Sequence, residues 1–282
     1  MRDQGGFTLV EVLIALSLGG LIIGSVFRIV SGYTRFVEME SARVEVQQNA
    51  RAAFEMIAGE MRSLGPGEGL VRADRDSITL RVPRVRGVIG GICPDGRPVV
   101  VFPATGEAGF GVNLGLGMEV HGSGESRAAR VLEISPPGAR CGVETAPGNE
   151  LRMLTLESPA DMEFSLPWMV PGDLVSLSEM VTYRTGSSAG VPGRWILRRV
   201  GSGPGATNQP FAGPIASGED GFRLEYFGGE SVLPLPVPVE DREVRARVNR
   251  VAVIVEWVSR YGSGDQQISR VDTIVVPLRN QD

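Results

Sequence analysis

The first part of the chain is an apolar run that follows a short polar segment. Residues 1–6 are polar and end in two glycines, and from Phe7 to Val30 the sequence is largely apolar. A helix that crosses a bilayer needs roughly 20 apolar residues, which this stretch supplies. The run is longer than the core of a secretory signal peptide, and no small-x-small cleavage site follows it. The pattern predicts one transmembrane segment over about residues 7–30.

The helical pattern continues beyond the membrane segment. From Ser31 to Leu64 there is no proline, and the composition favours helix. Gly65 and Pro66 then form a strong stop signal. We therefore predict one helix over residues 7–64, on the order of 85 Å long at 1.5 Å per residue. Its second half is amphipathic, because apolar residues recur in steps of three and four at Ala50, Phe54, Ile57, Met61 and Leu64.

After Gly67 the pattern changes to short β-branched and apolar runs between Gly, Pro, Ser and Asn clusters. Such runs predict strands, here over residues 77–82, 99–102, 129–134, 151–157, 173–184, 195–200, 222–227, 247–258 and 268–278. Segments 135–149, 201–220 and 232–238 are predicted to be loops.

The predicted fold class is α+β, with the long helix packed on an antiparallel β-rich head over residues 65–282. The run 247–258 is apolar on both faces, which predicts a central strand. We expect it to form a hairpin with 268–278. The sheet is the expected cover for the apolar stripe of the helix.

Composition narrows the function classes. Glycine (38) and proline (19) are frequent, but 42 % of the 282 residues are hydrophobic, so the excess indicates turns rather than disorder. The net charge of −5 argues against a nucleic-acid partner. All basic residues are arginines, so no lysine is present for Schiff-base chemistry. With one histidine and two cysteines, we expect no catalytic residue, no metal site and no cofactor.

One carboxylate, Glu11, lies inside the apolar run. A carboxylate in a membrane segment is energetically costly, so it is a functional-site candidate by default. Its surroundings strengthen this interpretation. The stretch Gly5-Gly6-Phe7-Thr8-Leu9-Val10-Glu11 resembles the prepilin cleavage and N-methylation motif of type IV pilins and type II secretion pseudopilins.

The resemblance implies a processing step at the start of the chain. Residues 1–6 would be a leader peptide that an inner-membrane prepilin peptidase removes by cleavage between Gly6 and Phe7, followed by methylation of the Phe7 amine. Cleavage creates a new ammonium group at Phe7, and Glu11 lies about 6 Å from it along the helix. Glu11 could neutralise its own amine or that of a neighbouring subunit. The resemblance favours the neighbour, so Glu11 would help to assemble a filament.

Two further pairs of residues are candidates for structural roles. Gly20 and Gly24 form a G-x-x-x-G, which either packs against another helix or reflects the ordinary frequency of glycine in membrane helices. Cys93 and Cys141 are predicted to form a disulfide in an extracytoplasmic head, with two unpaired buried thiols as the alternative. A bridge over 48 residues would stabilise the fold by roughly 4 kcal/mol in the chain-entropy model.

The C-terminal pattern suggests a subtype. The run from Val248 to Glu256 and the last strand before Arg279 resemble PilW- and PulJ-type minor pilins and pseudopilins. The resemblance implies a structural minor pilin of a type IV pilus that helps to initiate assembly or sits at the tip. Its implied partners are the major pilin, other minor pilins, the prepilin peptidase and the inner-membrane assembly platform.

Several alternatives remain open. A type II secretion minor pseudopilin of the J-like kind would show the same features. An adhesin, a DNA-uptake tip module and a membrane-anchored enzyme fit the sequence less well. The expected location is the bacterial inner membrane, with a single membrane pass and the head on the extracytoplasmic side, and after assembly the pilus or pseudopilus.

Overall fold

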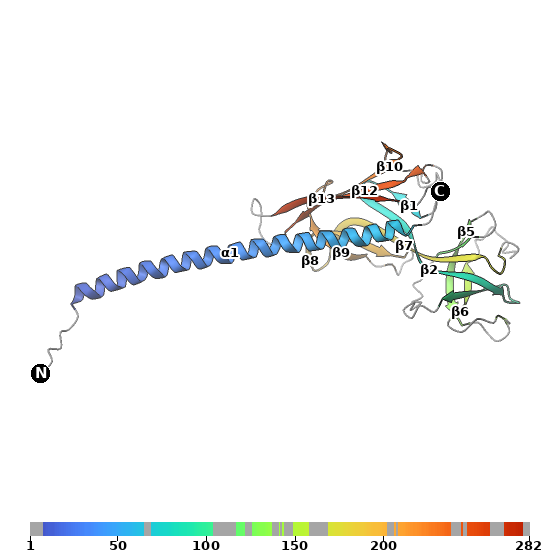
Figure 1. Ribbon diagram of the computed structural model, residues 1–282, viewed down its shortest axis with the longest axis horizontal. Coiled ribbons are helices and arrows are strands. Elements are labelled where there is room, and N and C mark those ends of the chain that lie inside the picture. Colours follow the sequence, from blue (N-terminus) through green and yellow to red (C-terminus); the bar gives the residue numbers. More distant parts are fainter. Residues whose placement is uncertain are drawn as a thin grey trace. The chain divides into compact units, whose positions relative to one another are not determined.

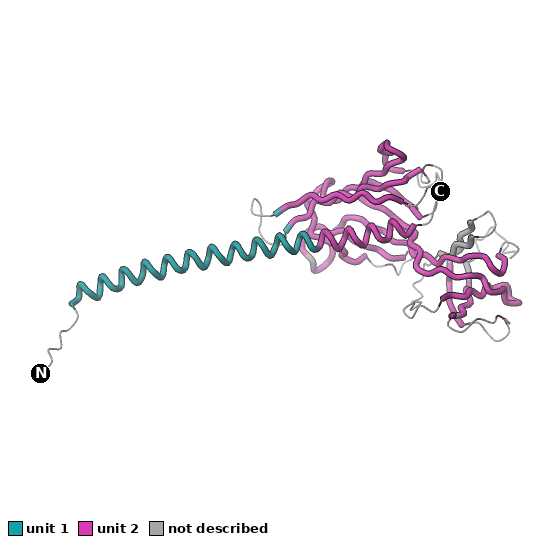
Figure 2. Tube along the Cα trace, viewed as in Figure 1, with its two compact units in different colours: residues 1–48, 259–268 teal, residues 49–258, 269–282 magenta. Residues whose placement is uncertain are grey.

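The computed structural model describes residues 8–64, 69–103, 117–121, 126–136, 141, 143, 149–157, 169–201, 206, 208–237, 244, 247–259 and 268–278. The chain divides into two compact units (Figure 2). The first comprises residues 1–48 and 259–268, and the second comprises residues 49–258 and 269–282. The boundary falls inside the long helix, so the end of that helix belongs to the second unit.

A single helix, α1 (Leu9–Arg62), accounts for most of the first 64 residues (Figure 1). It agrees with the predicted helix to within two residues at each end, and Phe7 lies outside the described residues. The glycines of the apolar half do not interrupt it. Ser63 and Leu64 close the last turn with backbone bonds to the carbonyls of Glu60 and Met61. The fold class is α+β, as predicted.

The head is a sheet in which every pairing between the described strands is antiparallel. The described residues form the strands β1 (Leu70–Ala73), β2 (Ser77–Ile92), β3 (Pro98–Pro103), β4 (Gly117–His121), β5 (Ser126–Ser135), β6 (Asn149–Glu157), β7 (Leu174–Ser188), β8 (Val191–Val200), β9 (Asn208–Ile215), β10 (Phe222–Gly228), β11 (Ser231–Val232), β12 (Arg250–Val258) and β13 (Ser269–Pro277).

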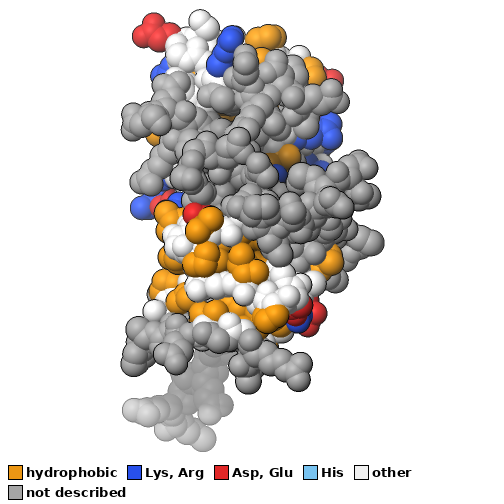
Figure 3. All heavy atoms as spheres, turned by 90° about the vertical axis from the view of Figure 1, so that its right-hand side faces the viewer, with side chains coloured by type: hydrophobic (Ala, Val, Ile, Leu, Met, Phe, Trp, Pro, Cys, Tyr) orange, Lys and Arg blue, Asp and Glu red, His pale blue; other side chains and the backbone are white. Residues whose placement is uncertain are grey.

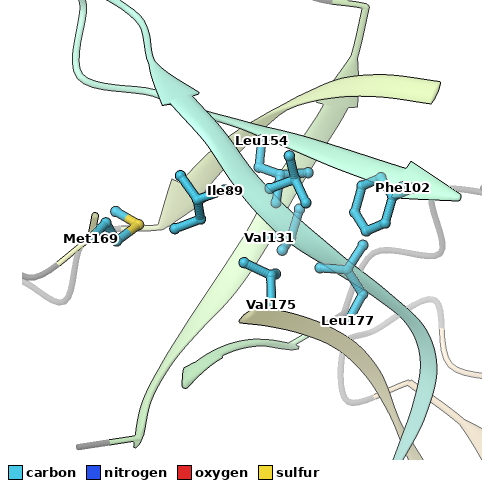
Figure 4. Close-up of a cluster of buried hydrophobic side chains, with 8 residues drawn as sticks. Ile89, Phe102, Val131, Leu154, Met169, Val175 and Leu177 are labelled. Carbon is cyan, nitrogen blue, oxygen red and sulfur yellow. The ribbon is translucent and has the colours of Figure 1, made fainter. Parts of the chain in front are cut away.

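Six strands close on themselves into a small barrel. The order β2-β3-β6-β5-β4-β7 is completed by a direct pairing of β7 with β2. Closure leaves these strands without free edges along the ring. Side chains fill the interior (Figure 4), namely Ile89, Val100, Phe102, Val131, Leu154, Met169, Val175 and Leu177. We call this part the barrel lobe.

Glycine is required at a tight point of the barrel wall. A Cβ at Gly87 would lie 2.7 Å from the Phe102 ring and 2.7 Å from the Val100 side chain. Real Cβ atoms do not approach other atoms this closely, so a larger residue would displace the core.

The barrel lobe also carries apolar side chains on its outside. Val88 pairs with Leu174 on one side and with Val101 on the other, so the three lie in one row across β7, β2 and β3. Val88 is 38 % exposed and Leu174 is 58 % exposed. Figure 3 shows apolar side chains gathered on the face of this part of the molecule.

The remaining strands form a curved sheet that packs on the end of α1; we call this part the helix lobe. Ile57, Met61 and Leu64 are buried, and the ring of Phe54 meets Trp257 of β12 edge to face at 5.9 Å. The predicted apolar stripe at the end of the helix is therefore covered by the sheet, as expected. Strands β12 and β13 pair with each other, as predicted for the hairpin. Strand β12 is central, because it lies between β13 and β10.

In the helix lobe, β10 lies beside the turn between β1 and β2. The backbone N–H of Leu224 in β10 donates to the carbonyl of Arg75 at 2.7 Å, and Tyr226 Oη donates to the carbonyl of Asp74 at 3.0 Å. These two hydrogen bonds attach the turn between β1 and β2 to β10.

The disulfide lies in the barrel lobe. Cys93 and Cys141 are joined with an S–S distance of 2.07 Å. The bridge belongs to a small apolar cluster with Val99 and Met153. It ties the turn that follows β2 to the segment between β5 and β6.

The strand predictions locate most of the sheet and fail in four places. Each predicted strand overlaps an observed one, but β1, β4, β9 and β11 were not predicted. The prediction of a loop over 201–220 is wrong, because β9 pairs with β8 there. Pro210 and Pro214 argued against a strand here, since proline has no backbone N–H to donate to a neighbouring strand. The pairing tolerates them through irregular register at Ile196 of β8.

Candidate functional site

The start of α1 is capped by its own side chains. Thr8 precedes the first helical residue, and Glu11 is three positions further on. Glu11 Oε2 accepts hydrogen bonds from Thr8 N at 3.0 Å and from Thr8 Oγ1 at 3.1 Å. The N–H of Glu11 is 3.3 Å from Thr8 Oγ1, which accepts from it. These are the reciprocal bonds of a capping box, in which side chains satisfy N–H groups that have no partner within the helix.

The capping box gives Glu11 a role that the sequence analysis did not foresee. The expectation considered only ammonium partners for this carboxylate. Within the described residues one oxygen, Oε2, is taken up by Thr8, and Oε1 has no hydrogen bond. A carboxylate in the first turn is also favoured by the helix dipole. The motif T-x-x-E was the signal that could have predicted this cap.

The apolar half of α1 has the properties of a membrane segment. Leu21, Ile23 and Phe27 are each at least 70 % exposed in the isolated chain. The helix is long and apolar enough to cross a membrane, by length and composition. The hydroxyls of Ser17 and Ser25 donate to backbone carbonyls four residues earlier, at 2.8 Å each. These bonds remove two polar groups that would otherwise be costly in lipid.

The proposed packing face at Gly20 and Gly24 is open. A Cβ built at either glycine meets nothing within 4 Å outside the helix's own backbone. No described residue of the chain thus packs against these two glycines. Its assignment to helix packing stays a prediction.

The other predicted residues belong to other parts of the chain or to the residues that are not described. Gly6 and Phe7 are not described. Cys93 and Cys141 form the disulfide of the barrel lobe. His121 ends β4. Among the described residues no group of three or more His, Cys, Asp or Glu side chains could hold a metal ion.

A second charged group on α1, Glu60, was missed by sequence reasoning. It is 7 % exposed and lies in the last turns of the helix. Its Oε1 accepts from Arg198 Nη2 at 2.6 Å and from Arg84 Nη2 at 2.9 Å, and its Oε2 accepts from Tyr183 Oη at 2.6 Å. Arg84 Nε also donates to Glu179 at 2.9 Å. We call these five residues the Glu60 cluster.

The electrostatics of the cluster follow from its geometry. Burial opposes ionisation of Glu60, but hydrogen bonds from Tyr183, Arg198 and Arg84 outweigh it and hold the pKa of the carboxyl below its ordinary range. Burial, together with the adjacent Glu60 charge, raises the pKa of Tyr183 well above the usual tyrosine value. The tyrosine therefore remains a hydrogen-bond donor at physiological pH. The signal in the sequence was a glutamate at helical spacing from Ile57 and Leu64, beside the apolar stripe.

Comparison with known proteins identifies the N-terminal segment. Residues 1–27 match the family model described as the prokaryotic N-terminal methylation motif. A search of curated proteins found no match to this chain, and neither did a search of solved structures.

Proposed function

We propose that this chain, which carries the N-terminal signature of type IV pilins and pseudopilins, is a minor pilin of a type IV pilus. It would be a structural subunit that helps to initiate filament assembly or sits at the filament tip. The observation that carries the proposal is the methylation motif, directly followed by a helix whose first half exposes its apolar side chains. Such a helix needs a bilayer or other helices around it.

The start of the chain would be processed before assembly. A prepilin peptidase would cut between Gly6 and Phe7, and the Phe7 amine would be methylated. The new ammonium would appear one residue before Thr8, at the end of the helix where Glu11 completes the cap. Because Thr8 engages Oε2, we expect Oε1 to accept the Phe7 ammonium of a neighbouring subunit. Glu11 would then serve the cap and the filament contact at the same time.

The size of the head and its C-terminal strands support a minor subunit. The head follows a 54-residue helix and includes a barrel lobe and a helix lobe. A large head limits how closely subunits can stack, so a minor position is favoured. The resemblance of the last two strands to PilW- and PulJ-type proteins points the same way. Partners would be the major pilin, other minor pilins and the inner-membrane assembly platform, with the head extracytoplasmic.

The second candidate is a minor pseudopilin of a type II secretion system, which shares the same signature. Deleting the gene in its own host separates the two, since loss of pili supports the first and loss of protein export supports the second. An adhesin, a DNA-uptake module or a membrane-anchored enzyme would instead need a ligand or substrate for the head.

The decisive experiment is co-expression of the full chain with a prepilin peptidase, followed by mass analysis of the N-terminus. We expect a chain that starts at methylated Phe7. A chain that keeps Met1 under these conditions would overturn the proposal.

A matched pair of variants tests the assembly role of Glu11. Glu11→Gln keeps the shape and part of the cap but removes the charge, so we expect normal membrane insertion and loss of co-purification with other pilins. Glu38→Gln is the control, because Glu38 is exposed on the same helix outside the membrane segment. Equal co-purification of both variants would count against a charge role for Glu11.

A further inference from the structure

The two lobes of the head share only two strands within the described part of the chain. β2 pairs with β1 at Ile78 and Leu80 in the helix lobe, and with β3 from Val88 onward in the barrel lobe. β7 pairs with β4 up to Ser178 and with β8 from Val181. Between these positions each strand has the other as its strand neighbour. The connection between the lobes therefore narrows to a two-stranded ribbon where Arg81 and Val82 pair with Met180 and Glu179, and we call this ribbon the waist.

A two-stranded ribbon is a weak support for a whole lobe. Such ribbons twist more than wide sheets and are marginally stable by themselves. Directly beside the waist there is an irregularity, since the register of β2 against β7 shifts between Pro83 and Val85. An extra residue in one strand disrupts the ladder locally and bends the strand. Without another constraint, the barrel lobe could bend or twist at this point.

The extra residue at the shift is Arg84, and its side chain supplies such a constraint. One end of the guanidinium group bonds Glu179 on β7, the strand partner of Val82 in the waist, and the other bonds Glu60 at the end of α1. Glu60 in turn is held by Arg198 of β8 and Tyr183 of β7, both in the helix lobe. The planar guanidinium has donors in a fixed arrangement, so it transmits orientation as well as charge.

We propose that the Glu60 cluster is a clamp that fixes the barrel lobe to the end of α1 and prevents it from moving about the waist. The clamp makes the helix and the barrel lobe one mechanical unit. A force or displacement applied to the helix is then passed to the barrel lobe rather than absorbed at the ribbon. Opening the clamp would free the barrel lobe to sample several orientations while both lobes stay folded.

The test measures the distance between the helix and the barrel lobe in the full chain in detergent micelles. Spin labels at Met56, exposed on α1, and at Glu133, exposed on β5, are attached through genetically encoded ketone side chains, which leave the disulfide undisturbed. Double electron–electron resonance should give a narrow distance distribution. Arg84→Met, which keeps much of the apolar stem but removes both ion pairs, should broaden it.

Two further variants make the test decisive. Arg86→Met is the matched control, because Arg86 lies on the same strand and is exposed, and it should leave the distribution narrow. If Arg84→Met fails to fold, Glu179→Gln removes one of the two carboxylates that hold Arg84 and should broaden the distribution by less. A folded Arg84→Met protein, or failing that a Glu179→Gln protein, with a distribution as narrow as the wild type overturns the proposal.

Discussion

Glu11 and Glu60 lie near opposite ends of one helix, and their surroundings give them different tasks. Glu11 is exposed, and among the described residues it bonds only within the first turn. Glu60 is enclosed by two arginines and a tyrosine from the sheet. A buried carboxylate must be paired to remain charged, whereas an exposed one is free to meet a new partner. Glu60 therefore stabilises the fold of the chain, and Glu11 remains available to the partner that we propose for it.

Removing the Thr8 hydroxyl should loosen the start of the helix. Thr8→Val loses two of the three bonds of the capping box and keeps the one from Thr8 N. The loss of a cap costs about 1 kcal/mol, which should appear as faster amide hydrogen exchange in the first turn of α1 in micelles. Thr34→Val is the control, since its hydroxyl bonds a carbonyl within the helix. Unchanged exchange in Thr8→Val would show that the cap contributes nothing.

The Glu60 cluster should make the free energy of unfolding of the head decrease at acidic pH. The pKa of Glu60 is lowered in the folded protein, mainly because bonds from Tyr183 and the two arginines outweigh burial. The stabilisation that ionised Glu60 provides is therefore complete above the carboxyl pKa of the unfolded chain, about 4.3. It is lost as the pH falls through the lower pKa that Glu60 has in the folded protein.

Denaturant unfolding of the full chain in detergent at a series of pH values measures this dependence. Glu60→Gln should be less stable by about 3–5 kcal/mol at neutral pH, because it leaves the arginines without their buried counter-charge. It should also lose part of the acid dependence. Glu55→Gln is the control, since Glu55 forms a surface pair with Arg51. Equal acid dependence of wild type and Glu60→Gln would refute the assignment.

At the scale of elements, helical spacing predicted both the extent and the buried face of α1. Ile57 and Met61 are buried as the stripe requires. The strands were predicted less completely. β2 runs ten residues past the predicted end at Val82, because its second half is glycine-rich and lies in the barrel wall. Local propensity cannot show that Gly87 is needed for contact with Phe102.

The buried face of α1 provides a stability prediction. Ile57→Ala should destabilise the head by about 2–5 kcal/mol, since it removes buried methyl groups and leaves a cavity. Met56→Ala, at the neighbouring exposed position, should change stability by no more than about 0.5 kcal/mol. Thermal unfolding of both variants in detergent, followed by near-ultraviolet circular dichroism, provides the comparison. Similar losses for both would mean that the stripe is not the packed face.

At the scale of the whole head, a barrel lobe and a helix lobe depend on the same two long strands. The disulfide lies in the barrel lobe and bridges a separation of 48 residues. The chain-entropy argument applies because closing a loop of this length restricts the unfolded chain. The bridge therefore stabilises the lobe whose described residues pack against no helix.

Removing the disulfide should act on the barrel lobe first. The double variant Cys93→Ser/Cys141→Ser should lose roughly 4 kcal/mol of stability. Hydrogen exchange should increase in β3 and β6, which flank the bridge, and much less in β12 of the helix lobe. Wild-type protein treated with a reductant serves as the second sample and should behave alike. An equal increase in β12 would show that the two lobes unfold together.

The sequence by itself determined the membrane segment, the long helix with its buried stripe, the α+β class and the N-terminal motif. These features are local, because each depends on spacing or composition within a few tens of residues. Only the tertiary structure decided the closure of the barrel lobe, the position of β9 and the burial of Glu60. Those depend on residues far apart in the chain, such as Glu60 with Arg198 or Ser77 with Arg184. No local pattern encodes such pairings, because they arise when the strands that carry them meet.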